Sequence, residues 1–174
     1  IEESIKSLQD KQIVSVRRGK VRIQSKDLEA GVPETIQGVI MARIDQLEER
    51  MREVLLSASV IGREFSRPIL KQVVPKKTKV RQNLDHLMGL EMILEKEEAQ
   101  ELEYLFKHYL IQEVAYSTIL IKRRKELHGQ IANAIEEIYS DRLKELYELL
   151  AFHYEKAEEW EKAAEYLDRA GKKA

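Results

Sequence analysis

The chain of 174 residues contains no cysteine, and both proline and glycine are scarce. Without cysteine it can form no disulfide, no thiolate nucleophile and no zinc finger. Such a chain suits a reducing compartment, so we expect a cytoplasmic protein. The prolines number only three, Pro33, Pro68 and Pro75, and all lie in the first half. Because proline and glycine interrupt helices, their scarcity predicts a mainly helical fold.

Long apolar runs and an excess of one charge are also absent. No apolar run approaches the roughly 18 residues of a membrane span, and no signal peptide is visible, so we expect no membrane partner. Lys and Arg number 30 against 31 Asp and Glu, which leaves no global electrostatic case for nucleic acid. Apolar residues make up 43% of the chain, enough for packed cores, and charged residues make up 35%, typical of exposed helix faces.

The sequence motifs of common catalytic sites are missing. The chain has no GxxxxGK loop followed by Ser or Thr, no HExxH pair and no GxSxG turn. His86, His128 and His153 lie in different predicted elements, so no metal site is expected. We therefore expect neither enzyme activity nor a cofactor in this chain. It starts at Ile1 rather than Met and ends within a helical pattern, and we interpret it as a piece of a longer protein.

The first region, residues 1–32, contains one alternating segment. Apolar and polar residues alternate from Ile13 to Gln24 around Gly19, which predicts a β-hairpin. Residues 31–33 (Gly-Val-Pro) then interrupt the chain and predict a break before the next helix.

The second region, residues 33–120, has the order of elements of a winged helix, which is a helix-turn-helix followed by a β-hairpin wing. Helical periodicity predicts a helix from Glu34 and a second one that stops at Gly62. A short helix with Ser66 as its N-cap follows, and then a longer helix with Asn83 on its outer face. Two short strands around a charged turn, and one further helix, complete the predicted order.

The third region, residues 121–174, has helical periodicity throughout. Helices are predicted over roughly residues 119–139, 143–156 and 160–172. The last two have the spacing of a tetratricopeptide repeat, in which small residues allow close approach and large residues fill the gaps. The residues at that spacing are Tyr147, Leu150, Ala151, Tyr154, Ala163, Leu167 and Ala170. Since about three repeats are needed to bury a core, we expect the array to continue and a protein partner to bind its concave face.

Five segments of the chain, in this order, resemble one protein family. They are VPETIQGVIMARIDQL, LLSASVIGREF, FKHYLIQEVAY, RRKELH and HYEKAEEWEKAAEYLDRAG. From Val32 to Ala174 the chain is similar to the signal-transducing STAND ATPases, relatives of AAA and NB-ARC proteins. The similar branch is bacterial and archaeal and carries adenylate cyclase, kinase or transcription-factor modules. The resemblance implies that residues 1–32 are the end of an ATPase lid, and that an upstream ATPase domain binds ATP or ADP with Mg²⁺.

The segment from Leu102 to Tyr116 is the strongest functional pattern. An alternating run ends at Lys107 and His108, and a helix with Leu110, Val114 and Ala115 on its apolar face starts at once. A strand that delivers a histidine to the first turn of a helix can aim it at a phosphate, which the helix N-terminus also attracts. The resemblance implies that His108 senses the nucleotide phosphates of the upstream domain, with Lys107 adding charge nearby. The alternative is a histidine that caps its helix locally beside a solvated lysine.

A basic turn before the longer helix suggests a different function. The basic residues around it are Lys71, Lys76, Lys77, Lys79 and Arg81, at the place where a DNA-reading winged helix begins its backbone and groove contacts. The acidic segment EKEEAQE of the wing would repel phosphate, and a solvated turn is the alternative. We therefore expect a non-catalytic regulatory and scaffold module that docks on the upstream ATPase domain. Two alternatives stay open: a DNA-binding transcription regulator, and a protein-interaction module with no nucleotide role.

Overall fold

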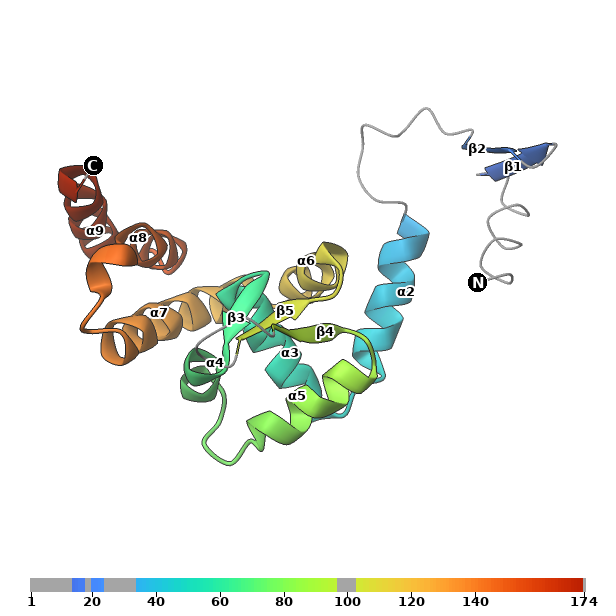
Figure 1. The fold of residues 1–174 in the computed structure, drawn as a ribbon, viewed down its shortest axis with the longest axis horizontal. Coiled ribbons are helices and arrows are strands. Elements are labelled where there is room, and N and C mark those ends of the chain that lie inside the picture. Colours follow the sequence, from blue (N-terminus) through green and yellow to red (C-terminus); the bar gives the residue numbers. More distant parts are fainter. Residues whose placement is uncertain (1–13, 18–19, 24–33, 97–102, 174) are drawn as a thin grey trace. The chain divides into compact units, whose positions relative to one another are not determined.

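The computed structural model describes residues 14–17, 20–23, 34–96 and 103–173 (Figure 1). Over these residues the chain is mainly helical, with eight α-helices and a small three-stranded antiparallel sheet, which confirms the mainly helical prediction. It divides into two compact units, Ile1–Gln37 and Gly38–Ala174. None of the described helices combines the length and apolar character required to cross a bilayer.

The first unit contains the predicted β-hairpin. Strand β1 (Val14–Arg17) pairs antiparallel with β2 (Lys20–Ile23), so that Val14 lies opposite Ile23. The pairing continues through Ser15 with Arg22, Val16 with Val21 and Arg17 with Lys20. The predicted break at residues 31–33 lies outside the described residues.

Helix α3 (Glu49–Ile61) is central to the second unit and follows α2 (Glu34–Asp45). Its inward side chains, among them Val54, Leu55 and Ala58, are buried at helical spacing. Around it pack α4 (Arg67–Val73), α5 (Val80–Gly89), α6 (Tyr109–Thr118) and α7 (Ile121–Ile138). Gly62 ends α3 as predicted, because its φ of 151° is a conformation that other residues rarely adopt.

The sheet has the strand order β3 (Glu64–Ser66), β5 (Glu103–Phe106), β4 (Ile93–Lys96), with both pairings antiparallel. Strands β4 and β5 are the two that the sequence predicts, although residues 97–102 between them lie outside the described part. Strand β3 is not among the predicted elements, because three residues are too few to show an alternation. The ring of Phe65 in β3 stacks on that of Tyr104 in β5, with 5.7 Å between centroids, which helps to hold the third strand.

Two side chains of this unit differ from the prediction. Ser66 makes no side-chain capping bond at α4. Its Oγ atom instead accepts a hydrogen bond of 3.2 Å from the hydroxyl of Tyr139, because α7 packs against α4. In α6 the fully inward positions are Ile111, Val114 and Ala115, and Leu110 is only half-buried. Val114 and Ala115 are buried as predicted, so most of the predicted apolar face is confirmed, and Ile111 rather than Leu110 completes it one turn earlier.

The C-terminal helices are α7, α8 (Tyr147–Lys156) and α9 (Trp160–Lys173). The predicted helix over residues 143–156 is split, since a short 3₁₀ segment, η1 (Leu143–Glu145), precedes α8. Helices α8 and α9 pack along each other, with Ala151 and Ala163 buried between them.

The prediction that Leu167 fills the gap between these two helices is wrong. Leu167 is 58% exposed, whereas its neighbour Tyr166 is only 6% exposed. The Tyr166 ring stacks on that of Tyr154 at 5.8 Å. Tyr166 lies three residues after Ala163 and so shares its face of α9, whereas Leu167 is turned roughly 100° further round the helix.

Candidate functional site

The junction of Lys107 and His108 lies between β5 and α6, where the sequence predicts it. The backbone N–H of Lys107 donates a hydrogen bond of 3.0 Å to the carbonyl of Met92, which extends the pairing of β5 with β4 by one residue. His108 is the N-cap residue of α6, and its carbonyl accepts a hydrogen bond from the Ile111 N–H. The His108 imidazole is exposed and makes no capping bond, so it does not serve as the local helix cap.

A carboxylate already lies beside this junction. Glu91, two residues before β4, forms an ion pair of 2.9 Å with Lys107. The pKa of Glu91 is lowered, chiefly by its hydrogen bond with Lys107 and the charge of that lysine, with smaller effects from Arg43 and His108. Arg43 of α2 is fixed nearby, because its Nη2 donates a hydrogen bond of 2.7 Å to the Leu90 carbonyl. Lys107 thus already has an acidic partner, and any phosphate that binds Lys107 must compete with Glu91.

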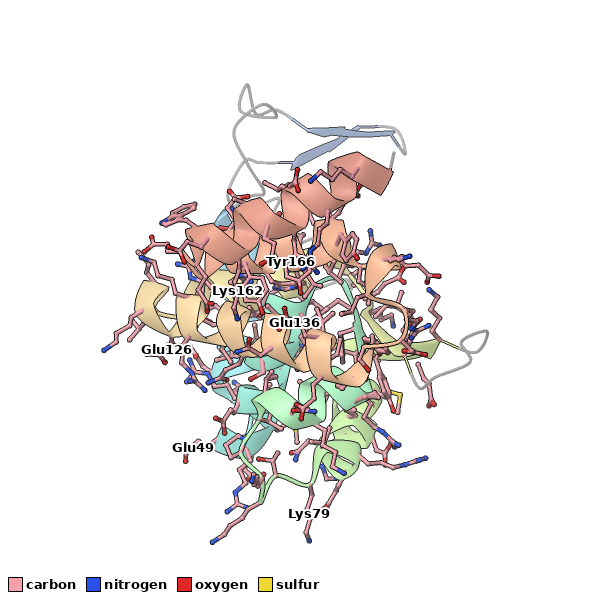
Figure 2. The ribbon with its side chains drawn as sticks, turned by 90° about the vertical axis from the view of Figure 1, so that its left-hand side faces the viewer. Glu49, Lys79, Glu126, Glu136, Lys162 and Tyr166 are labelled. Atoms are coloured by element: carbon pink, nitrogen blue, oxygen red, sulfur yellow. The ribbon has the colours of Figure 1, made fainter. Side chains whose placement is uncertain are left out.

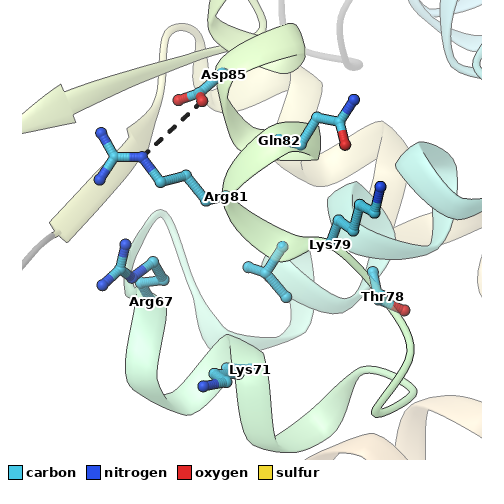
Figure 3. Close-up of a pocket in the computed structure, with 8 residues that line it drawn as sticks. Arg67, Lys71, Thr78, Lys79, Arg81, Gln82 and Asp85 are labelled. Atoms are coloured by element: carbon cyan, nitrogen blue, oxygen red, sulfur yellow. Dashed lines mark ion pairs between the residues drawn. The ribbon is translucent and has the colours of Figure 1, made fainter.

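The basic turn between α4 and α5 borders a groove with a volume of about 570 Å³ (Figure 3). The groove is lined by Arg67, Lys71, Thr78, Lys79, Val80, Arg81, Gln82 and Asp85. The single acid, Asp85, lies 4.0 Å from Nε of Arg81, at the limit of an ion pair. Four basic side chains against one acidic side chain leave the groove with a local positive charge.

Only part of this groove follows from the sequence. Of the five predicted basic residues, Lys71, Lys79 and Arg81 line the groove, whereas Lys76 and Lys77 are exposed on the turn beside it. Arg67 was missed as a candidate because it comes from the start of α4, and only the packing of α4 on α5 brings it near.

Asn83, predicted on the outer face of α5, is 7% exposed. Its Nδ2 atom donates a hydrogen bond of 3.0 Å to the Lys79 carbonyl. The side-chain amide of Asn83 therefore bonds to the backbone one turn earlier in the chain, and it is not available to a ligand in the groove.

Two histidines that the sequence places 25 residues apart are in contact in the fold. His128 of α7 and His153 of α8 are 1% and 0% exposed, and their Nδ1 atoms lie 2.9 Å apart. Nε2 of His128 lies 3.1 Å from the hydroxyl of Tyr116 in α6. The three side chains form a buried hydrogen-bonded row across α6, α7 and α8. A signal was present in the sequence, since each histidine falls on the apolar face of its helix, beside Leu127 and Leu150 respectively.

Both histidines are neutral at pH 7. Burial lowers the pKa of His128 from 6.5 to about 4, with smaller effects from the charges of Lys156 and Arg124. Burial also lowers the pKa of His153 to about 3, with a smaller effect from His128. No group of three or more potential metal ligands exists among the described residues, so two histidines alone do not make a metal site.

A polar cluster joins α9 to α7, and Figure 2 shows Lys162, Tyr166 and Glu136 within it. The Tyr166 hydroxyl donates to the carboxylate of Glu136, and the Tyr154 hydroxyl donates to Oδ1 of Asn133 at 3.0 Å. The pKa values of both tyrosines are raised, first by burial and then by the hydrogen bond and charge of Glu136. Each of these hydroxyl groups has its partner on α7, so the cluster ties α8 and α9 to α7.

Comparison with known proteins gives little further information. No protein-family profile matches the chain. Part of it is similar to "Uncharacterized protein R02095" of Rhizobium meliloti (strain 1021), with 28% identity over 103 residues. The aligned part is 58% of this chain and 10% of that protein, so the chain corresponds to a small part of a much longer relative.

Proposed function

We propose that this chain is a non-catalytic regulatory and scaffold module of a signal-transducing ATPase of the STAND type. The order of α3, α4, α5, β4 and β5 supports a winged helix, and the packed pair α8 and α9 supports a tetratricopeptide-like repeat. The single observation that carries the proposal is the exposed His108, held at the N-terminus of α6 directly after β5. In the intact protein this module docks on the nucleotide-binding domain, while the repeat binds a protein partner.

The surroundings of His108 suggest how nucleotide exchange changes the docking. In the closed state the phosphates of ADP attract His108 and Lys107, assisted by the N-terminus of α6. When the domains separate, the Glu91 carboxylate, 2.9 Å from Lys107, again neutralises that lysine. The module therefore has an internal anion that replaces the phosphate, which keeps the free-energy difference between docked and released states small.

The test requires the longer protein that contains the ATPase domain. His108→Ala should speed the release of bound ADP, measured with a fluorescent ADP analogue in a stopped-flow displacement experiment. His86→Ala is the matched control, because His86 is also exposed but lies in α5, away from the junction. ADP release at the wild-type rate in His108→Ala would support the alternative of a protein-interaction module with no nucleotide role.

A second candidate function, DNA binding, is favoured by the basic groove between α4 and α5. Arg67, Lys71, Lys79 and Arg81 come from two helices and border one groove, as phosphate-binding residues of a helix-turn-helix would. The opposing observation is that Lys96 of β4 is held by two acids, with ion pairs of 2.7 Å to Glu64 and 3.6 Å to Glu103. Lys96 is therefore already paired with acidic side chains and is not free to contact a phosphate.

Gel-shift measurements on the purified chain distinguish this candidate. DNA binding predicts a shift of duplex DNA that weakens steeply as salt rises, and that Lys79→Glu reduces. Lys122→Glu is the matched control, because Lys122 is exposed at the start of α7 and outside the groove. The absence of any shift at low salt would exclude the DNA-binding function.

A further inference from the structure

The groove between α4 and α5 carries basic side chains on both of its walls (Figure 3). Arg67 and Lys71 lie one turn apart on α4, and Lys79 and Arg81 lie at the start of α5. Among the described residues, Arg67, Lys71 and Lys79 have no acidic partner within ion-pair distance. Arg81 has only the contact of 4.0 Å between its Nε and Asp85. The charges of this groove are therefore available to an anionic partner.

The two arginines favour carboxylates as the groups that bind. Figure 3 shows the guanidinium groups of Arg67 and Arg81 on the same side of the groove, although they come from different helices. A guanidinium presents its N–H donors in a planar fork that matches the two oxygens of a carboxylate. Arg67 is also half-buried, so its side chain loses less conformational freedom on binding than a fully exposed arginine would. Two such forks along one groove fit successive carboxylates of an anionic chain.

The uncharged polar residues of the groove suit a peptide backbone. The Thr78 hydroxyl and the Gln82 amide each donate and accept hydrogen bonds, and neither is bonded to another described residue. They can therefore pair with the N–H and C=O groups of an extended chain. The single acid, Asp85, lowers the positive potential beside Arg81, so the attraction for carboxylates is strongest toward the α4 wall.

The distribution of charge matches a narrow anionic chain better than a duplex. A duplex reader places basic residues along its recognition helix and on its wing, where they reach the phosphates of both strands. Arg81 is the only lysine or arginine within α5, and Lys96 of β4 is already paired with Glu64 and Glu103. The cations are instead gathered around one groove of about 570 Å³, which is within the roughly 300–1,000 Å³ of ligand pockets.

We infer that the groove between α4 and α5 binds a short acidic peptide segment, whose carboxylates pair with Arg67, Lys71, Lys79 and Arg81. The inference goes beyond the proposed nucleotide sensing, because it involves neither Lys107 nor His108. It assigns the helix-turn-helix a protein ligand in the place where the second candidate function puts duplex DNA, so the experiment compares the two.

The experiment uses the whole chain and a fluorescein-labelled hexaglutamate peptide as the probe, followed by fluorescence anisotropy at low salt. Hexaglutamate should bind saturably, and hexaglutamine, which has the same length without the charges, should bind about tenfold more weakly. Unlabelled duplex DNA is the competitor, compared with unlabelled hexaglutamate at equal concentration of negative charge. No saturable binding, equal binding of hexaglutamine, or more effective displacement by duplex DNA would each overturn the inference.

A first pair of variants locates the peptide in the groove. Lys71→Gln removes one exposed charge from the α4 wall and should weaken hexaglutamate binding about fivefold. Lys122→Gln is the matched control, because Lys122 is exposed at the start of α7 and outside the groove. Equal losses in the two variants would indicate a diffuse attraction to the whole surface, and the inference would then be wrong.

A further variant tests the fork of the half-buried arginine. Arg67→Lys keeps the positive charge but replaces the planar fork by a point charge, so it should weaken hexaglutamate binding about threefold. Unchanged affinity in a folded Arg67→Lys variant would contradict the pairing of Arg67 with a carboxylate. If circular dichroism shows that this variant does not fold, the comparison of Lys71→Gln with Lys122→Gln decides the question.

Discussion

Mild acid should destabilise this chain through its two buried histidines. His128 and His153 have pKa values of about 4 and about 3 in the fold, against 6.5 for an unperturbed histidine. Between pH 6.5 and pH 4 the unfolded chain therefore binds protons that the folded chain does not. The stability that these groups contribute is fully present above pH 6.5, and it is lost as the pH falls toward 4.

The magnitude follows from the size of the two shifts. Each histidine protonated only in the unfolded chain lowers the free energy of unfolding by about 1.4 kcal/mol per pH unit. From pH 7 to pH 5, both histidines together lower it by about 4 kcal/mol. That is a large fraction of the roughly 5–15 kcal/mol of a typical domain.

The assay is urea unfolding followed by circular dichroism at pH 7, 6 and 5. Most carboxyl groups stay ionised over this pH range, because their unperturbed pKa values lie near 4. The variant His86→Gln is a control, because His86 is exposed, and it should show the same pH dependence as the wild type. A free energy of unfolding that changes by less than about 1 kcal/mol between pH 7 and pH 5 would refute the reasoning, since two neutral buried histidines cannot give so small a change.

Other variants test the packing and the backbone. Leu84→Ala should lower the free energy of unfolding by about 2–5 kcal/mol, because Leu84 is 0% exposed, whereas Leu167→Ala should change it by less than about 0.5 kcal/mol. Gly62→Ala should cost about 1–3 kcal/mol because of its positive φ, whereas Gly38→Ala, in open space on α2, should stabilise by about 0.5–1 kcal/mol. Tyr166→Phe should cost about 1–2 kcal/mol, because it removes the hydrogen bond to the half-buried Glu136. Urea unfolding at pH 7 measures all of them, and equal values for a variant and its control would contradict the corresponding assignment.

Local patterns in the sequence predict the helices and the strands β4 and β5, because periodicity is set by neighbours along the chain. The same patterns miss β3, whose three residues become a strand only when Phe65 meets Tyr104 of β5. They also assign Leu167 to the packed face of α9 in place of Tyr166, since both residues are large and adjacent. The choice between them depends on the rotation of α9 against α8, which is a tertiary property.

The candidate sites also fall into two groups, those predicted from contiguous residues and those formed only by the tertiary fold. The position of His108 at the end of a strand and the start of a helix follows from contiguous residues, and the sequence predicts it. The contact of His128 with His153 and the entry of Arg67 into the basic groove depend on helices that are distant in the chain. Nothing local to these residues indicates which helix lies opposite, so a single sequence does not reveal them.

The bond between Tyr139 and Ser66 connects the end of α7 to the start of α4, and it lies in a core that continues from Ile44 to Tyr166. Residues 38–174 accordingly form one compact unit. Any rearrangement of the C-terminal helices relative to the sheet would have to break this bond and part of that continuous core, so the two sets of elements are stabilised together.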